Sequence, residues 1–332
     1  MMLKFNLPRE PTFKIERPKN CKLREINSDH IPKQLLPFFD LTYKFFDLIS
    51  DNKVLKDKYI VEKKKKKIFI KIIEVQNIKL LNLTNAIEDY IFKKKVNSLK
   101  FLKAFKCKFN KNTFILLYKY VDSRFFNSTE KDVINIGKKL GELHNTLLFF
   151  PQMSLVRNYS VKRFDYINTL FEKILRTRSK LKINSVGMEI VKKCKLKRKY
   201  FFNNYSQTIH GDLNYSNIIF DKIMDNPIFV DFETSCFSWE DPLFDVAQVI
   251  DRFIGNQEKN PRKLTNIFLE SYSSVTKRHL NIDELSIIIE QRSIKSLLLL
   301  IAKEQVGLKV CQSEYDKFLS KLNFGVHRNG KK

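Results

Sequence analysis

The sequence predicts an α+β protein with two lobes, a small N-terminal lobe built on an antiparallel sheet and a larger, mainly helical C-terminal lobe. The chain has 332 residues, which is enough for two domains of ordinary size. Short strand-like runs dominate before residue 121, and helical periodicity dominates after residue 128. We therefore divide the chain into an N-terminal extension (1–40), an N-terminal lobe (41–121) and a C-terminal lobe (122–332).

The expected N-terminal lobe contains two strand pairs and one helix. YIVE (59–62) and KIFIKII (67–73) flank a run of lysines, which predicts a hairpin with a solvated tip. FKCKF (105–109) and FILLYKYV (114–121) form a second pair around a turn at 110–112. The segment between the pairs, NLTNAIEDYIFKKKV (82–96), has the apolar spacing of one helix.

The expected C-terminal lobe contains a series of amphipathic helices. In residues 128–149 the apolar side chains recur at intervals of three and four, and Ser128 or Thr129 is placed as the N-cap. The same pattern continues over 161–175. Further helices are expected at 243–254, 263–275 and 284–307.

Composition limits the class of protein. The formal net charge of +26 is compatible with nucleic-acid binding, but the abundance of Lys, Asn, Ile and Phe is also what an AT-rich coding bias produces. No apolar run reaches the length of a membrane span, and no secretory signal is visible. The five cysteines form no C-x-x-C pair. We expect a reduced, cytoplasmic protein without a zinc site and without a specific nucleic-acid partner.

The segment IHGDLNYSNIIFD (209–221), followed by IFVDFE (228–233), concentrates chemically active side chains. The pattern predicts a short hairpin, and a turn centred on Met224 places Asn217 opposite Asp231. An amide and a carboxylate oxygen there suit Mg²⁺, which takes few protein ligands and leaves the rest to water and phosphate. Asp212 lies in the preceding loop, free to face a substrate hydroxyl. These are the requirements of phosphoryl transfer.

The same residues resemble the catalytic signature of aminoglycoside phosphotransferases and choline kinases, small-molecule relatives of the protein kinases. The matching positions are His210-Gly211-Asp212-Leu213-x-x-x-Asn217 and the later Asp231-Phe232-Glu233. The resemblance implies a protein-kinase-like fold, ATP and Mg²⁺ as cofactors, Asp212 as catalytic base, and Asn217 and Asp231 as the magnesium ligands. It also implies that His210 braces this loop.

The resemblance extends to further positions. Asp245, in WEDPLFDVA, matches an aspartate that supports the catalytic loop. Lys71 matches the lysine that holds the α- and β-phosphates, and Glu88 is its expected ion-pair partner. Tyr118 and Tyr120, in LLYKY (116–120), match the hinge whose backbone meets adenine.

One departure from the family concerns the phosphate loop. All eight glycines lie at or beyond Gly137, so a glycine-rich loop is absent from the expected N-terminal lobe, and SDNK (50–53) is the best candidate for that turn. Two functions therefore stay open besides nucleic-acid binding. One is an active kinase that phosphorylates a hydroxyl of a small molecule, such as a sugar, an amino alcohol, a glycan or lipid headgroup, or a vitamin. The other is a degenerate kinase-like binding or structural protein.

Overall fold

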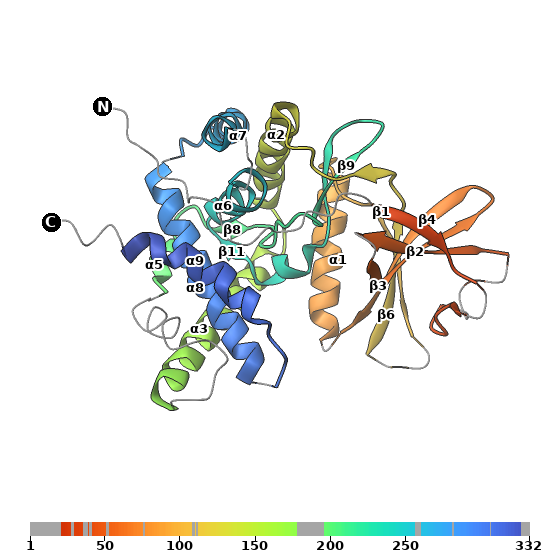
Figure 1. Ribbon diagram of the computed structural model, residues 1–332, viewed down its shortest axis with the longest axis horizontal. Helices are drawn as coiled ribbons and strands as arrows, with labels where there is room; N and C mark the ends of the chain where they lie inside the picture. The colour runs from red at the N-terminus through yellow and green to blue at the C-terminus, as the bar shows by residue number, and fades with distance from the viewer. Residues whose placement is uncertain are drawn as a thin grey trace.

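The computed structural model describes residues 21–27, 30–35, 39, 42–50, 53–75, 77–107, 110, 112–177, 196–255, 260–280, 282–305 and 307–326. Within these residues a six-stranded sheet and one helix lie at one end of the molecule, and a larger helical region lies at the other (Figure 1). This arrangement confirms the predicted α+β fold with a small sheet lobe and a larger helical lobe.

The sheet of the N-terminal lobe is antiparallel throughout, with strand order β1-β2-β3-β4-β6-β5. Its strands are β1 (Cys21–Glu25), β2 (Lys44–Ser50), β3 (Lys53–Lys63), β4 (Lys66–Glu74), β5 (Phe101–Lys106) and β6 (Thr113–Lys119). The lysine run forms the turn between β3 and β4, where Lys64 and Lys65 have φ of 50° and 64°. The predicted lysine-rich hairpin tip is thus confirmed.

Two features of this sheet differ from the sequence prediction. The sequence did not predict β1 and β2. β1 lies within residues 1–40, which were assigned to the N-terminal extension. The boundary of that extension at residue 40 stays a proposal. β5 begins at Phe101, earlier than expected, and residues 108–109 of the predicted run lie outside the described residues, as do residues 51–52 of SDNK.

Both faces of the sheet are covered, because alternate residues of β6 point to opposite sides. On one face Ile115 and Leu117 join a cluster with Leu35 and Phe45. On the other face Leu116 and Tyr118 pack with the first turn of α1 (Ile78–Lys93). The helix starts earlier than predicted because Asn77 caps it, its side chain accepting a hydrogen bond from the Lys79 amide at 3.0 Å.

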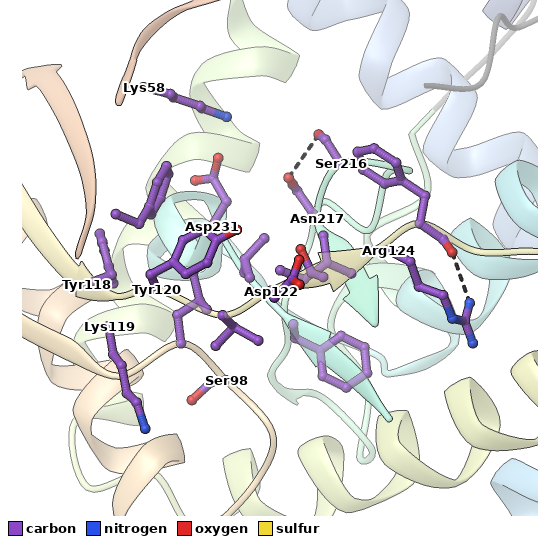
Figure 2. Close-up of a pocket in the computed structure, with 18 of the residues that line it drawn as sticks. Lys58, Ser98, Tyr118, Lys119, Tyr120, Asp122, Arg124, Ser216, Asn217 and Asp231 are labelled. Carbon is purple, nitrogen blue, oxygen red and sulfur yellow. Dashed lines mark hydrogen bonds between the residues drawn. The ribbon is translucent and has the colours of Figure 1, made fainter. Parts of the chain in front are cut away.

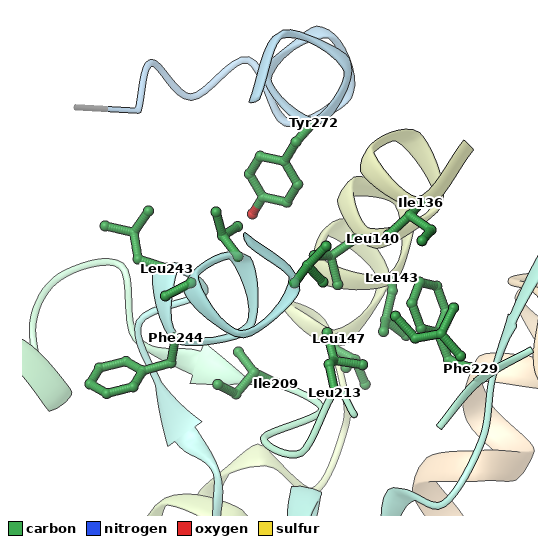
Figure 3. Packing of buried hydrophobic residues seen from close by; sticks show 14 of the residues in the cluster. Ile136, Leu140, Leu143, Leu147, Ile209, Leu213, Phe229, Leu243, Phe244 and Tyr272 are labelled. Carbon is green, nitrogen blue, oxygen red and sulfur yellow. The ribbon is translucent and has the colours of Figure 1, made fainter. Parts of the chain in front are cut away.

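The helical lobe is organised around α2 (Glu130–Leu147) and α7 (Pro261–Thr276), which pack against each other. Thr129 is the N-cap of α2, as expected. The predicted apolar stripe is buried along its full length, at Val133, Ile136, Leu140, Leu143 and Leu147. Figure 3 shows that this stripe meets Ile209 and Leu213 from the central loop, so the loop is anchored by the main core of the lobe.

The other described helices complete the lobe, and three short strand pairings involve the strands that precede and follow the Asp212 loop. The helices are α3 (Met153–Thr177), α5 (Arg198–Phe201), α6 (Leu243–Val249), α8 (Ile282–Gln305) and α9 (Gln312–Val326), with a π-helical turn, η3 (Ile250–Ile254), after α6. The strands are β7 (Ser123–Arg124), β8 (Gln207–Thr208), β9 (Ile218–Asp221), β10 (Pro227–Phe229) and β11 (Trp239–Glu240). In the part of the chain that the structure describes, every helix is too short or too polar to span a bilayer.

Candidate active site

A cavity of about 630 Å³ lies between the sheet of the N-terminal lobe and the β9–β10 hairpin. Figure 2 shows side chains from both lobes projecting into it. Six of the seven residues predicted for the site line this cavity, and the seventh, Asp212, does not. The six are Lys71, Glu88, Tyr118, Tyr120, Asn217 and Asp231. The structure thus brings together residues that are far apart in the sequence.

Lys71 projects from β4 toward the helical lobe and pairs with two carboxylates there. Its Nζ lies 3.0 Å from Asp231 Oδ1 and 2.6 Å from Glu233 Oε1. Burial alone lowers the pKa of Lys71, but the two carboxylates outweigh burial, so the pKa lies above its ordinary value. Lys71 is therefore charged and placed against the end of the IFVDFE segment.

Glu88 was expected to be the ion-pair partner of Lys71, and this expectation is wrong for the present structure. Its side chain is only 5% exposed on α1 and forms no ion pair with Lys71 among the described contacts. Instead the Tyr118 hydroxyl donates a hydrogen bond to it, and its Oε2 has no hydrogen-bond partner among the described residues. Burial raises the pKa of Glu88 to about 7, although Tyr118 and the nearby Lys71 charge oppose that rise. Lys71 instead forms its ion pairs with the closer carboxylates of Asp231 and Glu233.

The two hinge tyrosines have different positions. The ring of Tyr118 packs near Phe69 and Phe101, with centroids 5.9 and 5.6 Å away, so it belongs to the wall of the N-terminal lobe. Tyr120 follows the end of β6 and lines the cavity where the chain crosses between the lobes. The segment that ends β6 is therefore an edge of the cavity.

The register of the β9–β10 hairpin differs from the prediction by one residue. Phe220 pairs with Pro227 and Ile218 with Phe229, and the Val230 amide donates to the Asn217 carbonyl at 3.0 Å. Asn217 thus lies opposite Val230, and the prediction that it lies opposite Asp231 is wrong. The Asp221 amide donates a hydrogen bond to the Asn226 carbonyl at 3.0 Å and closes the turn. The turn is therefore centred between two residues and not on Met224.

Asp231 still lines the same cavity as Asn217, because the chain leaves the strand at this residue. Its φ of 69° and ψ of 65° are left-handed, which turns the side chain away from the direction that strand alternation would give. Asn217 is 4% exposed and its Nδ2 donates to the Asp212 carbonyl at 2.8 Å. One carboxylate residue and one amide residue therefore line the cavity, and Asn217 Oδ1 accepts a hydrogen bond from Ser216 Oγ at 3.2 Å.

This donor set suits a hard divalent cation that is held together with phosphate groups. Among the described residues no group of three or more His, Cys, Asp or Glu side chains forms a metal site. A zinc-type site made of protein ligands alone is thus not found in that part of the chain. Mg²⁺ needs only one or two protein oxygens when phosphates and water complete its shell, and Asn217 and Asp231 fit that requirement.

Asp212 lies in the loop beneath Asn217. Its side chain is 39% exposed, and its Oδ1 accepts a hydrogen bond from Arg252 Nη1 at 3.1 Å. Its Oδ2 accepts from Asn214 at 3.2 Å. Arg252 was not identified from the sequence, although it follows Asp245 by about two helical turns and so shares its side of the helix.

The loop that carries Asp212 is fixed from below by Asp245. This buried carboxylate accepts hydrogen bonds from the His210 and Gly211 amides, both at 2.8 Å, and its Oδ2 lies 3.1 Å from His144 Nε2. Burial alone raises the pKa of Asp245, but these contacts prevail and lower it below its ordinary value. His210 Nε2 in turn lies 3.0 Å from the Val230 carbonyl, which connects the loop to the hairpin.

Position 211 requires glycine for two reasons, the conformation of the backbone and the lack of room for a side chain. Its φ is 81°, a left-handed conformation that glycine adopts without a steric cost. A Cβ at this position would overlap the side chain of Ser238. An arginine, which protein kinases carry here, would not fit.

Comparison with known proteins supports the fold and the motif. Residues 195–272, which contain Asp212, Asn217 and Asp231, match the phosphotransferase enzyme family. A search of curated proteins finds no match to the chain.

Solved structures with the same fold cover nearly the whole chain. They include APH(2")-IIia in complex with GDP and kanamycin (TM-score 0.54, 13% identity, covering 89% of this chain and 96% of that one). LicA in complex with AMP gives a TM-score of 0.52 at 13% identity, covering 87% and 96%. An aminoglycoside phosphotransferase from Alicyclobacillus acidocaldarius gives 0.50 at 13% identity, covering 90% and 97%. At such identities the likeness shows the fold, and the protein-kinase-like fold implied by the motif is confirmed. Residues 195–272 thus resemble the phosphotransferase enzyme family in sequence, and the chain has a kinase-like fold.

Proposed function

We propose that this protein transfers the γ-phosphate of ATP to a hydroxyl group of a small molecule, with Asp212 as base and with Asn217 and Asp231 holding Mg²⁺. The observation that carries this proposal is the convergence of Lys71, Asn217 and Asp231 on one cavity between the lobes. Asp212 lies directly beside it, since its carbonyl accepts a hydrogen bond from the Asn217 side chain at 2.8 Å.

The cavity has a phosphate end and a base end. Lys71 and Asp231 mark the phosphate end, where a lysine amine meets the proposed metal ligand at 3.0 Å. Tyr118 and Tyr120 mark the end where the chain passes from one lobe to the other. LicA was solved with AMP and APH(2")-IIia with GDP, which supports a purine nucleotide as the occupant of this cavity.

Lys71 changes partners in this proposal. Without nucleotide it is neutralised by Asp231 and Glu233, at 3.0 and 2.6 Å. With nucleotide its amine would donate to phosphate oxygens, and Asp231 would be free to bind the metal. Mg²⁺, when bound, would neutralise charge on the β- and γ-phosphates.

Asp212 would orient the acceptor hydroxyl and take its proton. In phosphoryl transfer the hydroxyl becomes acidic late in bond formation, so an ordinary ionised carboxylate is sufficient. The Asp212 side chain is partly exposed, which leaves it accessible to an acceptor, and Arg252 and Asn214 hold its two oxygens at 3.1 and 3.2 Å.

Isothermal titration with Mg²⁺-ATP and Mg²⁺-GTP tests the nucleotide half of the proposal. We expect binding by the wild type and a loss of roughly tenfold or more in Lys71→Ala, because a hydrogen bond to a charged group contributes about 1.5–3 kcal/mol. Lys66→Ala and Lys79→Ala are matched controls, since both side chains are exposed. No binding by the wild type, or equal losses in all three variants, would overturn the assignment.

A second candidate function is nucleotide binding without transfer. It is favoured by the absence of glycine from the chain before Gly137, which removes the usual backbone cradle for the phosphates. Formation of ADP that depends on an acceptor distinguishes the two functions.

A further inference from the structure

Lys58 lies on β3 directly opposite Lys71 of β4. Directly opposed residues of antiparallel strands point to the same face, with Cβ atoms about 4.5–5.5 Å apart. Both side chains line the cavity. Figure 2 shows Lys58 entering it on the side of Asp231. A second lysine therefore reaches the phosphate end of the proposed nucleotide site.

An irregularity in β3 positions Lys58. Asp47 of β2 pairs with Tyr59, whereas Ile49 pairs with Val54, so residues 55–58 of β3 lie opposite a single residue of β2. Asp57, next to Lys58, has a left-handed φ of 63°. Bulges of this kind re-aim side chains and are frequent beside active sites.

The next pair on the same face of these two strands, two residues along, is apolar. Ile60 lies opposite Phe69, and both line the cavity. On the cavity face of β3 and β4, two amines are thus followed, two residues along each strand, by two apolar side chains. This change matches the division of a nucleotide into a charged phosphate chain and a flat, weakly polar base.

Two lysines directly opposed on one face carry an electrostatic cost, because like charges at such positions destabilise a sheet. Asp231 and Glu233 neutralise Lys71. A polyanion bound between the two amines would attract both positive charges. The chain also has no glycine before Gly137, so the sequence of this lobe contains no glycine-rich phosphate loop.

We propose that Lys58 is a second phosphate-binding residue, which together with Lys71 holds the phosphate chain of the nucleotide in place of glycine-loop amides. An ammonium group supplies a full charge and three hydrogen-bond donors. The inference rests on the proposed nucleotide site and adds to it a residue that the catalytic motif does not contain.

Titration of Lys58→Ala with Mg²⁺-ATP and with adenosine tests this inference, with Lys66→Ala as the control. Lys66 is an exposed lysine on β4, and its side chain points to the other face of the sheet from that of Lys71. We expect Lys58→Ala to weaken ATP binding roughly tenfold or more and adenosine binding by less than about twofold, because only ATP carries the phosphates. Lys66→Ala should match the wild type for both ligands.

The melting temperature without nucleotide provides a second readout. For Lys58→Ala and Lys58→Gln we expect a melting temperature close to that of the wild type, which would show that the fold is retained and that a loss of ATP binding reflects the site. Equal losses for ATP and adenosine would mean that the change acts on the fold or on the base, and would overturn the inference. So would ATP binding by Lys58→Ala at the level of Lys66→Ala. If the wild type itself binds no ATP, the proposed nucleotide site fails as well, so the two failures are distinguishable.

Discussion

The carboxylate of Asp212 is held by Arg252, with 3.1 Å between Asp212 Oδ1 and Arg252 Nη1. Arg252 lies in the π-helical turn η3, and its buried Nε has no hydrogen-bond partner in the part of the chain that the structure describes. The contact with Asp212 orients the proposed base before an acceptor arrives.

Replacement of Asp212 tests the role of base. Asp212→Asn should leave the affinity for Mg²⁺-ATP nearly unchanged and lower turnover by about 10²–10⁴-fold, the usual contribution of a positioned proton acceptor. Titration calorimetry and an ADP-release assay on the same preparation measure the two effects. A loss of nucleotide binding that equals the loss of turnover would place Asp212 in the nucleotide site instead.

Replacement of Asp231 tests the role of metal ligand. Asp231→Asn is the suitable change, because asparagine tolerates the left-handed φ of 69° better than alanine does. We expect ATP affinity to lose its dependence on Mg²⁺ and turnover to fall with it, since one charged ligand of the ion is gone. Asp122→Asn is the control, because Asp122 lines the same cavity but forms an exposed ion pair with Lys222. Retained dependence on Mg²⁺ in Asp231→Asn would contradict the assignment.

Glu88 should make stability depend on pH. Its pKa is raised from 4.5 to about 7, so the folded state holds this proton more tightly than the unfolded chain. The stabilisation is complete below pH 4.5 and is lost as the pH rises through about 7. The loss is on the order of 3 kcal/mol.

Urea unfolding of Glu88→Gln at several pH values checks this expectation. The variant should gain stability over the wild type as the pH increases from about 4 to 8, because glutamine does not ionise. Asp89→Asn, on the same helix but half-exposed and paired with Lys93, should follow the wild type. Parallel curves for wild type and Glu88→Gln would show that Glu88 titrates in the ordinary range.

Asp245 should matter for the fold as much as for turnover. Asp245→Asn replaces one of the oxygens that accept from the His210 and Gly211 amides, and it removes the charge beside His144. Breaking a buried charged contact typically costs about 3–5 kcal/mol. We therefore expect a lower melting temperature together with lower turnover, whereas Asp212→Asn should lower turnover alone. A variant as stable as the wild type would contradict the supporting role of Asp245.

Much of the fold followed from local sequence patterns. The stripe from Val133 to Leu147 predicted α2 and its buried face, because helical spacing and burial coincide there. The chemical motif drew attention to Asn217 and Asp231, which do line one cavity. Local signals of this kind need no knowledge of distant partners.

Other features depend on tertiary contacts or on single backbone angles. The hairpin register was missed by one residue because the closing pair of the turn, Asp221 and Asn226, is not visible in a hydrophobic pattern. The partner of Lys71 was missed because Asp231 and Glu233 reach it from the other lobe. Arg252 carries no motif of its own, since its role arises only from the packing of η3 against the Asp212 loop.

Formation of ADP in the presence of pooled hydroxyl compounds tests the central claim most directly. The pools would contain sugars, amino alcohols, vitamins, and glycan and lipid headgroups, with Mg²⁺-ATP at a concentration that saturates the wild type. The account predicts that at least one pool stimulates ADP release by the wild type and that Asp212→Asn, which still binds ATP, gives at least a hundredfold less, about the lower end for a general base. ATP binding without stimulated ADP release from any pool would contradict transfer and favour a protein that only binds nucleotide. Equal release by wild type and Asp212→Asn would contradict the proposed catalytic residue.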